Sequence, residues 1–208
     1  MKLIFATLIL FTGIAIPSQA QTNEDQASDT PLWTEEDRQY LLDNLIKSKE
    51  ELIQGTKNLT DEQWNFRESS DRWNINQIVE HVAIWELIVM NEISVALQMG
   101  EFPQIKKYPP DSLFLGQDPN NNETTDFTKP FSYSVPLGNN EGTNNLIWLT
   151  KMRDESIEFV KKETRNLRLY YINFGPNIHH KCMQIFAHTY RHLQQIRKVK
   201  AHPNYPKS

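Results

Sequence analysis

Cysteine, excess positive charge and long hydrophobic runs are all scarce in this sequence. Its single cysteine, Cys182, excludes an internal disulfide bond, so the packing of a core must stabilise the fold. On an apolar helix face we interpret Cys182 as a small buried side chain rather than as a nucleophile. The formal net charge is −4, whereas nucleic-acid binding usually needs a basic face. We therefore predict no nucleic-acid partner.

The hydrophobic run near the N-terminus is too short to favour a membrane span. It follows one early cation, Lys2, and covers the 14 residues from 3 to 16, whereas a spanning helix needs about 20. Residues 18–20, with the sequence SQA, then resemble a cleavage site for export. We predict that residues 1–20 are a signal peptide. The mature protein is then expected to be exported, to the periplasm or fully secreted, with no membrane attachment.

Amphipathic helical patterns dominate the rest of the chain. Residues 21–31 are polar and aperiodic, which is typical of a disordered leader, and residues 32–208 follow as one domain. Thr34 and Asn74 are predicted to cap two helices, and Pro176 to lie in the first turn of another. Apolar residues recur at helical spacing in four segments, at residues 34–56, 75–99, 143–164 and 176–201.

A long proline-rich segment separates the second and third helical patterns. Residues 101–142 contain six prolines, so they cannot form a regular helix. We expect this crossover to pack down and to wall one side of a cleft, because it carries several aromatic residues. These are Tyr108, Phe114, Phe127, Phe131 and Tyr133. Four amphipathic helices with one long crossover predict an all-α fold, a four-helix bundle.

Two histidines stand four residues apart in the fourth helical pattern. In the sequence HTYRH, His188 and His192 share one helix face, with Cβ atoms about 5–6 Å apart. On a helical wheel His192 lies ~60° and His188 ~100° from the centre of the apolar stripe, so both line its flank. Two imidazoles at this spacing can bind one metal ion, although the same spacing also arises by chance.

The other four histidines differ in whether their helical positions favour metal binding. His81 lies in the middle of the second helix beside apolar surface, where it is either a third ligand or a hydrogen-bonded residue at the edge of the core. His179 lies on the other flank of the fourth helix and His180 almost opposite its stripe, so we discount both as ligands. His202 follows that helix and is expected to be solvated.

Glu86 interrupts the apolar stripe of the second helix. A carboxylate there is costly unless it is paired or hydrogen-bonded. One hypothesis is an ion pair with a cation from another helix. The other is a role beside the metal, either orienting a ligand histidine or acting as a general base. The sequence leaves both open.

Two motifs at opposite ends of the helical pattern resemble those of DinB-like proteins. The stretch WNINQIVEHVAIWE, residues 73–86, is similar to the family signature Trp-Ser-Ile-x-x-[IV]-x-x-His, with Asn74 in place of serine. The closing stretch, residues 191–208, resembles the family's His-x-x-Gln-Ile followed by Lys-x-x-Pro-x-[FY]-Pro. The resemblance implies an up-down-down-up bundle with a crossover after the second helix. It also implies a divalent metal, zinc or nickel, held by His81, His188 and His192.

The resemblance implies several chemistries. Some DinB-like proteins resemble thiol transferases and others resemble metal-dependent hydrolases. The expected signal peptide argues against a thiol cofactor, because small thiols are chiefly cytoplasmic. The leading hypothesis is a metal-dependent enzyme of hydrolase or transferase type acting on an unidentified small molecule, with Glu86 or Tyr190 assisting. The alternatives are a metal-binding module without catalysis and a helical interaction protein. A homodimer is compatible with each of them.

Overall fold

Four long helices and one short helix make up most of the residues that the structure describes. The computed structural model describes residues 32–105, 110–114, 132–172 and 175–207. The predicted signal peptide and leader lie outside these residues, as do Tyr108, Phe127 and Phe131 of the crossover. The helices are α1 (Glu35–Thr56), α2 (Asp61–Asn65), α3 (Ile75–Met99), α4 (Gly142–Lys162) and α5 (Ile178–Lys200). Two 3₁₀ turns, η1 (Asp111–Leu113) and η2 (Ser132–Ser134), belong to the crossover.

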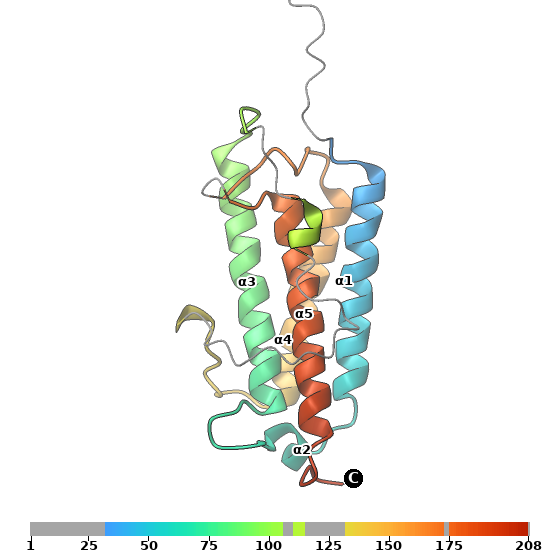
Figure 1. The fold of residues 1–208 in the computed structure, drawn as a ribbon, viewed down its shortest axis with the longest axis vertical. Coiled ribbons are helices and arrows are strands. Elements are labelled where there is room, and N and C mark those ends of the chain that lie inside the picture. Colours follow the sequence, from blue (N-terminus) through green and yellow to red (C-terminus); the bar gives the residue numbers. More distant parts are fainter. Residues whose placement is uncertain (1–31, 106–109, 115–131, 173–174, 208) are drawn as a thin grey trace, which may run out of the picture.

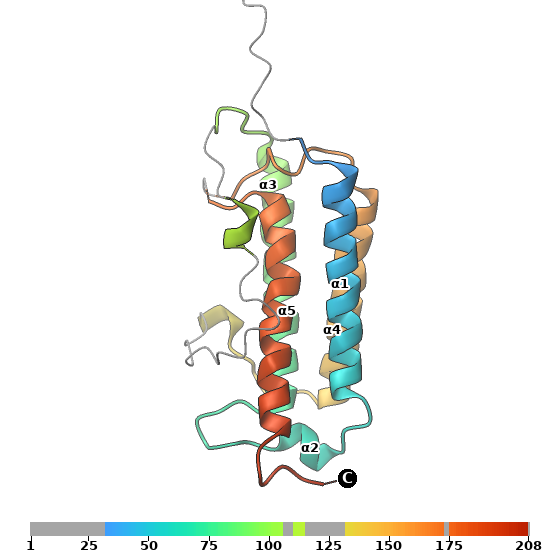
Figure 2. The same cartoon turned by 45° about the vertical axis from the view of Figure 1, so that its right-hand side comes forward.

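The long helices form a bundle with the expected up-down-down-up connectivity. In Figure 1, α3 and α4 run in one direction while α1 and α5 run in the other. Both α3 and α1 pack against α4 and α5, so α1 and α3 occupy opposite corners. The rotated view of Figure 2 shows α1 in front of α4 and α5 in front of α3. The prediction of an all-α helical bundle is confirmed.

Capping residues place the helix ends. Thr34 and Asn74 accept hydrogen bonds from the backbone N–H groups three residues later, as predicted. Gly100 ends α3 with a φ of 90°, a conformation that favours glycine. The predicted start of the last helix was wrong. Pro176 lies outside the helix, because α5 begins at Ile178. Asn177 caps α5, and its side chain accepts a hydrogen bond from His180 N.

The apolar stripes of the four long helices meet in one core. α3 is long and apolar enough to span a membrane by length and composition alone, but here it packs against both α4 and α5. Cys182 is buried in this core, and burial raises the pKa of its thiol to about 12. The interpretation of Cys182 as a packing residue agrees with its position. Other fully buried core residues include Leu41, Leu45, Ile78, Val82, Ile93 and Ile185.

Hydrogen bonds between charged side chains hold η1, in the first part of the crossover, against the end of the bundle. Arg168 donates hydrogen bonds from both terminal nitrogens to Asp111 of η1, at 2.9 and 2.8 Å. It also donates to Asp37 of α1 at 2.8 Å. Phe114 stacks on the ring of His180, with the ring centroids 4.0 Å apart. The expectation that the crossover packs down is therefore met at these residues. We call the cluster of Asp37, Asp111, Phe114, Arg168, His179 and His180 the Asp111 clasp.

Candidate metal centre

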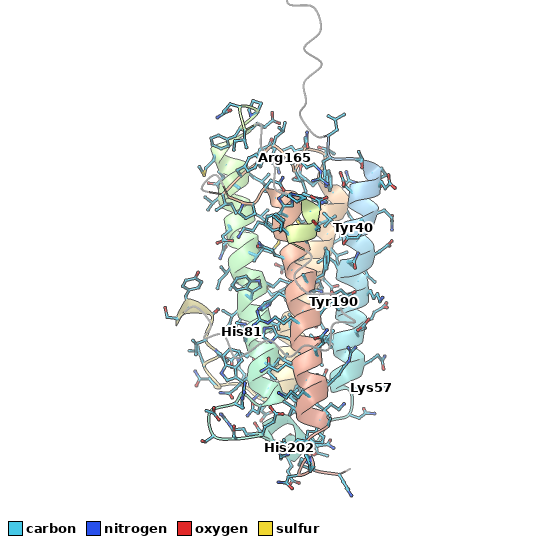
Figure 3. The ribbon with its side chains drawn as sticks, viewed as in Figure 1. Tyr40, Lys57, His81, Arg165, Tyr190 and His202 are labelled. Carbon is cyan, nitrogen blue, oxygen red and sulfur yellow. The ribbon has the colours of Figure 1, made fainter. Side chains whose placement is uncertain are left out.

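Three histidines from two helices come together in the lower half of the bundle. His188 Nε2 lies 3.2 Å from His81 Nε2 and 3.1 Å from His192 Nε2. One nitrogen from each residue falls within 4.8 Å of the other two. His81 and His192 are buried and His188 is half-buried, so the cluster reaches the surface on the His188 side. Figure 3 labels His81 in the region between α3 and α5.

Hydrogen bonds fix which ring nitrogens face the centre of the cluster. His81 Nδ1–H donates to the backbone carbonyl of Ser134 in the crossover, at 2.6 Å. His192 Nδ1–H donates to the side-chain oxygen of Gln195 at 2.8 Å. A neutral imidazole carries one proton, so the Nε2 atoms of both rings present lone pairs. Both lone pairs point toward His188 Nε2, and a single proton there serves only one of them.

Burial keeps the three rings neutral. It lowers the pKa of His81 below its ordinary value of 6.5, it lowers that of His188 well below it, and it lowers the pKa of His192 to about 3. The positive charge of Arg191, which lies between His188 and His192 in α5, also lowers all three pKa values. Metal ligation requires neutral imidazole. The rings are therefore already in the protonation state that a metal ion needs.

The spacing of the three nitrogens suits a divalent ion. Imidazole nitrogens bind zinc at about 2.0–2.1 Å, so two of them lie about 2.9 Å apart at a right angle and about 3.4 Å apart at a tetrahedral angle. The observed separations of 3.1 and 3.2 Å fall between these limits. An ion would also relieve the repulsion between lone pairs. His81, His188 and His192 therefore form a group that could hold a metal ion.

Two tryptophan rings border the cluster. Trp73 packs against His81 with the ring centroids 4.8 Å apart. Trp85 stacks on His188 at the same centroid distance, with an angle of 29° between the planes. Two buried polar atoms lie in this second pair, Trp85 Nε1 and His188 Nδ1, and neither has a hydrogen-bond partner among the described residues.

A second group of ligand-type residues consists of Asp37, Asp111 and His179. Its carboxylates already hold a cation, because Arg168 donates to both. Trp33 Nε1–H donates to His179 Nδ1 at 3.2 Å, so in the neutral ring Nε2 carries the proton and lies 3.4 Å from Asp111. These three residues therefore belong to the Asp111 clasp, in which Arg168 binds both carboxylates.

The remaining histidines are less exposed than their helical positions indicate. His179 and His180 lie outside the group of His81, His188 and His192, and both are almost fully buried. The other residues of the Asp111 clasp pack against them, and His180 Nε2–H donates to Asp111 at 2.9 Å. Sequence reasoning missed this burial. His202 is half-buried rather than solvated, with its ring against Phe66 at a centroid distance of 5.4 Å.

Glu86 forms the ion pair that one of the two hypotheses predicts. Arg153 of α4 donates from Nε to one carboxylate oxygen at 2.8 Å and from Nη2 to the other at 3.0 Å. Ser156 Oγ–H adds a bond of 2.7 Å. Glu86 and Arg153 are both about 1% exposed. Both carboxylate oxygens therefore have donors, and a role as general base stays a prediction.

Arg153 uses all of its donors inside the bundle. Besides Glu86, it donates to Leu45 O and Ser48 Oγ of α1 and to Thr189 Oγ1 of α5. The network thus joins all four long helices, and Thr189 is adjacent to His188 in the chain. We call Glu86, Arg153, Ser48, Ser156 and Thr189 the core network.

Tyr190 does not face the three histidines. Its ring contacts Phe186, with centroids 6.3 Å apart, and Phe186 in turn contacts Tyr40 of α1. In Figure 3, Tyr190 and His81 are labelled on opposite sides of α5. Burial, followed by the charge of Glu51 on α1, raises the pKa of Tyr190 to about 12. The structure thus brings Tyr190 to the α1 side of the bundle.

Comparison with known families agrees with the fold and the histidine cluster. The sequence matches the family model of the DinB superfamily over residues 44–196. The chain belongs to the DinB superfamily. This match includes His81, His188 and His192. Searches of curated proteins and of solved structures gave no significant match. The predicted resemblance to DinB-like proteins is therefore confirmed at the level of the family.

Proposed function

We propose that this DinB-superfamily protein is a metal-dependent enzyme of hydrolase or transferase type. The observation that carries the proposal is the convergence of three neutral Nε2 atoms, two of them with lone pairs fixed by Nδ1–H bonds. Three histidines leave coordination positions open for water and substrate, as catalytic zinc sites do. Three imidazoles favour zinc or nickel over magnesium or calcium, which prefer oxygen ligands.

The chain's own residues would hold and orient the centre. Ser134 O and Gln195 Oε1 would fix the tautomers of His81 and His192. A divalent ion held there would supply Lewis-acid chemistry, polarising a substrate oxygen or lowering the pKa of a water molecule. Trp73 would pack against the ring of His81 and Trp85 against the ring of His188, and both would hold the imidazoles in place. The substrate is proposed to be a small molecule, and the enzyme to act after export from the cytoplasm.

A reaction screen on one preparation in three states tests this function. The protein is stripped with a chelator and then reloaded with zinc or with nickel. Each form is assayed on activated esters, phosphate esters and thiol-transfer pairs. Turnover that depends on the metal and is lost in His81→Ala supports the proposal. Equal rates for the stripped and reloaded forms across the screen would contradict it.

A further inference from the structure

Trp85 carries a hydrogen-bond donor that the protein does not use. Its indole Nε1 has less than 1 Å² of exposed surface and no acceptor among the residues that the structure describes. Buried indole N–H groups usually find a partner. Packing against His188 explains why residue 85 is aromatic, and a phenylalanine would stack there equally well. Packing does not explain why the residue carries a buried N–H group without an acceptor among the described residues.

The imidazole ring of His188, on which Trp85 stacks, also has an unused nitrogen. His188 Nδ1 is buried and has no hydrogen-bond partner among the described residues. When His188 Nε2 binds a metal ion, Nδ1 must carry the proton and becomes a donor. The two rings are 4.8 Å apart and inclined by 29°, so two unused donors lie in adjacent rings beside the proposed metal position. By contrast, His81 and His192 each have an acceptor at Nδ1.

The position and charge of these donors indicate what they bind. Trp85 and His188 are half-buried, whereas His81 and His192 are buried, so the cluster is least covered at the Trp85–His188 side. Arg191 is half-buried on the same helix, one turn after His188, and its charge acts on all three histidines. Two N–H donors close to a guanidinium and a metal ion favour an acceptor with negative charge.

We propose that Trp85 Nε1–H, together with His188 Nδ1–H, binds an anionic oxygen group of the substrate, a carboxylate or a phosphate. The His188 part rests on the proposed metal function, whereas the Trp85 part rests on its own unused donor. The group would be held at the edge of the centre, while the bond that reacts lies over the metal. Trp85 is thus a substrate-positioning residue.

Nuclear magnetic resonance of the indole N–H groups tests this site directly. Zinc-loaded, ¹⁵N-labelled protein is titrated with acetate and, separately, with inorganic phosphate, at constant ionic strength set with NaCl. The Trp85 indole signal is identified by its loss in Trp85→Phe, a variant that keeps the ring stack on His188. We expect this signal to move downfield and to saturate with at least one of the two anions. The anion that saturates it identifies the group as carboxylate or phosphate.

Affinity for the anion provides the second readout. Trp85→Phe should bind that anion ~10-fold more weakly and retain its full zinc content, because only a charge-assisted hydrogen bond is lost. Trp148→Phe, a half-buried tryptophan of α4 outside the cluster, should bind as the parent does. An unmoved Trp85 signal in fully zinc-loaded protein, or equal affinity in Trp85→Phe, would overturn the anion site alone. Failure of the parent to retain zinc would overturn the proposed metal function.

Discussion

The core network offers a quantitative test of how the bundle is held together. In Glu86→Ala the guanidinium of Arg153, about 1% exposed, loses both carboxylate bonds and becomes an unpaired buried charge. Removing one partner of such a pair typically costs about 3–5 kcal/mol of unfolding free energy. The total stability of a domain is about 5–15 kcal/mol, so the loss should lower the melting temperature by ~6–20 °C.

A double variant separates the ion pair from the packing. Glu86→Leu with Arg153→Met removes both charges, and the remaining hydroxyls keep partners, because Thr189 Oγ1 donates to Ile185 O and Ser48 Oγ to Leu45 O. The double variant should recover most of the stability lost in either single variant. Urea denaturation of the parent, Glu86→Ala, Glu86→Leu, Arg153→Met and the double variant measures this. A loss below about 1 kcal/mol in Glu86→Ala, or a double variant less stable than both singles, would refute the reasoning.

Three further predictions concern the clasp, acid stability and glycine packing. Asp111→Asn weakens the bonds from Arg168 and should speed amide exchange of residues 111–114 by ~5-fold. This corresponds to about 1 kcal/mol, because Asp111 is 40% exposed. Unchanged exchange would count against the clasp. Burial lowers the pKa of five histidines below 6.5, so the unfolded chain binds more protons below that pH. The unfolding free energy of the metal-free protein, measured by urea denaturation, should therefore fall from pH 7 to pH 5, by up to about 1.4 kcal/mol per pH unit for each histidine. A constant unfolding free energy would contradict this. Gly142→Ala overlaps the ring of Trp64 and should lose about 1–3 kcal/mol, whereas Gly55→Ala meets only an ordinary contact and should gain about 0.5–1 kcal/mol; the same sign for both would be contrary to this packing.

Local chemistry made the helices predictable. The capping residues Thr34 and Asn74 act on backbone groups three residues away, so a short stretch of sequence contains both partners. The group of His81, His188 and His192 could be predicted from the sequence for a related reason. Helical spacing places two of its members on one flank, and the family motifs imply the third.

Contacts between distant segments were not predictable in the same way. The Asp111 clasp joins residues 57 and 69 positions apart in the chain, and nothing near Asp111 identifies Arg168 or His180 as its partner. For Glu86 the sequence indicated that a cation is needed but not which one. A signal was present, because Arg153 shares the buried face of α4 with Leu149, Ile157 and Val160.

The most direct test of the metal centre is metal content by mass spectrometry. The protein from Gln21 onward is measured beside His188→Ala and His192→Ala, with Trp148→Phe as a folded control. Circular dichroism of each variant checks that the bundle is intact. We predict about one equivalent of zinc or nickel in the parent and in the control, and none in the two histidine variants. A folded parent that binds neither metal after reconstitution, or histidine variants that retain it, would contradict the account.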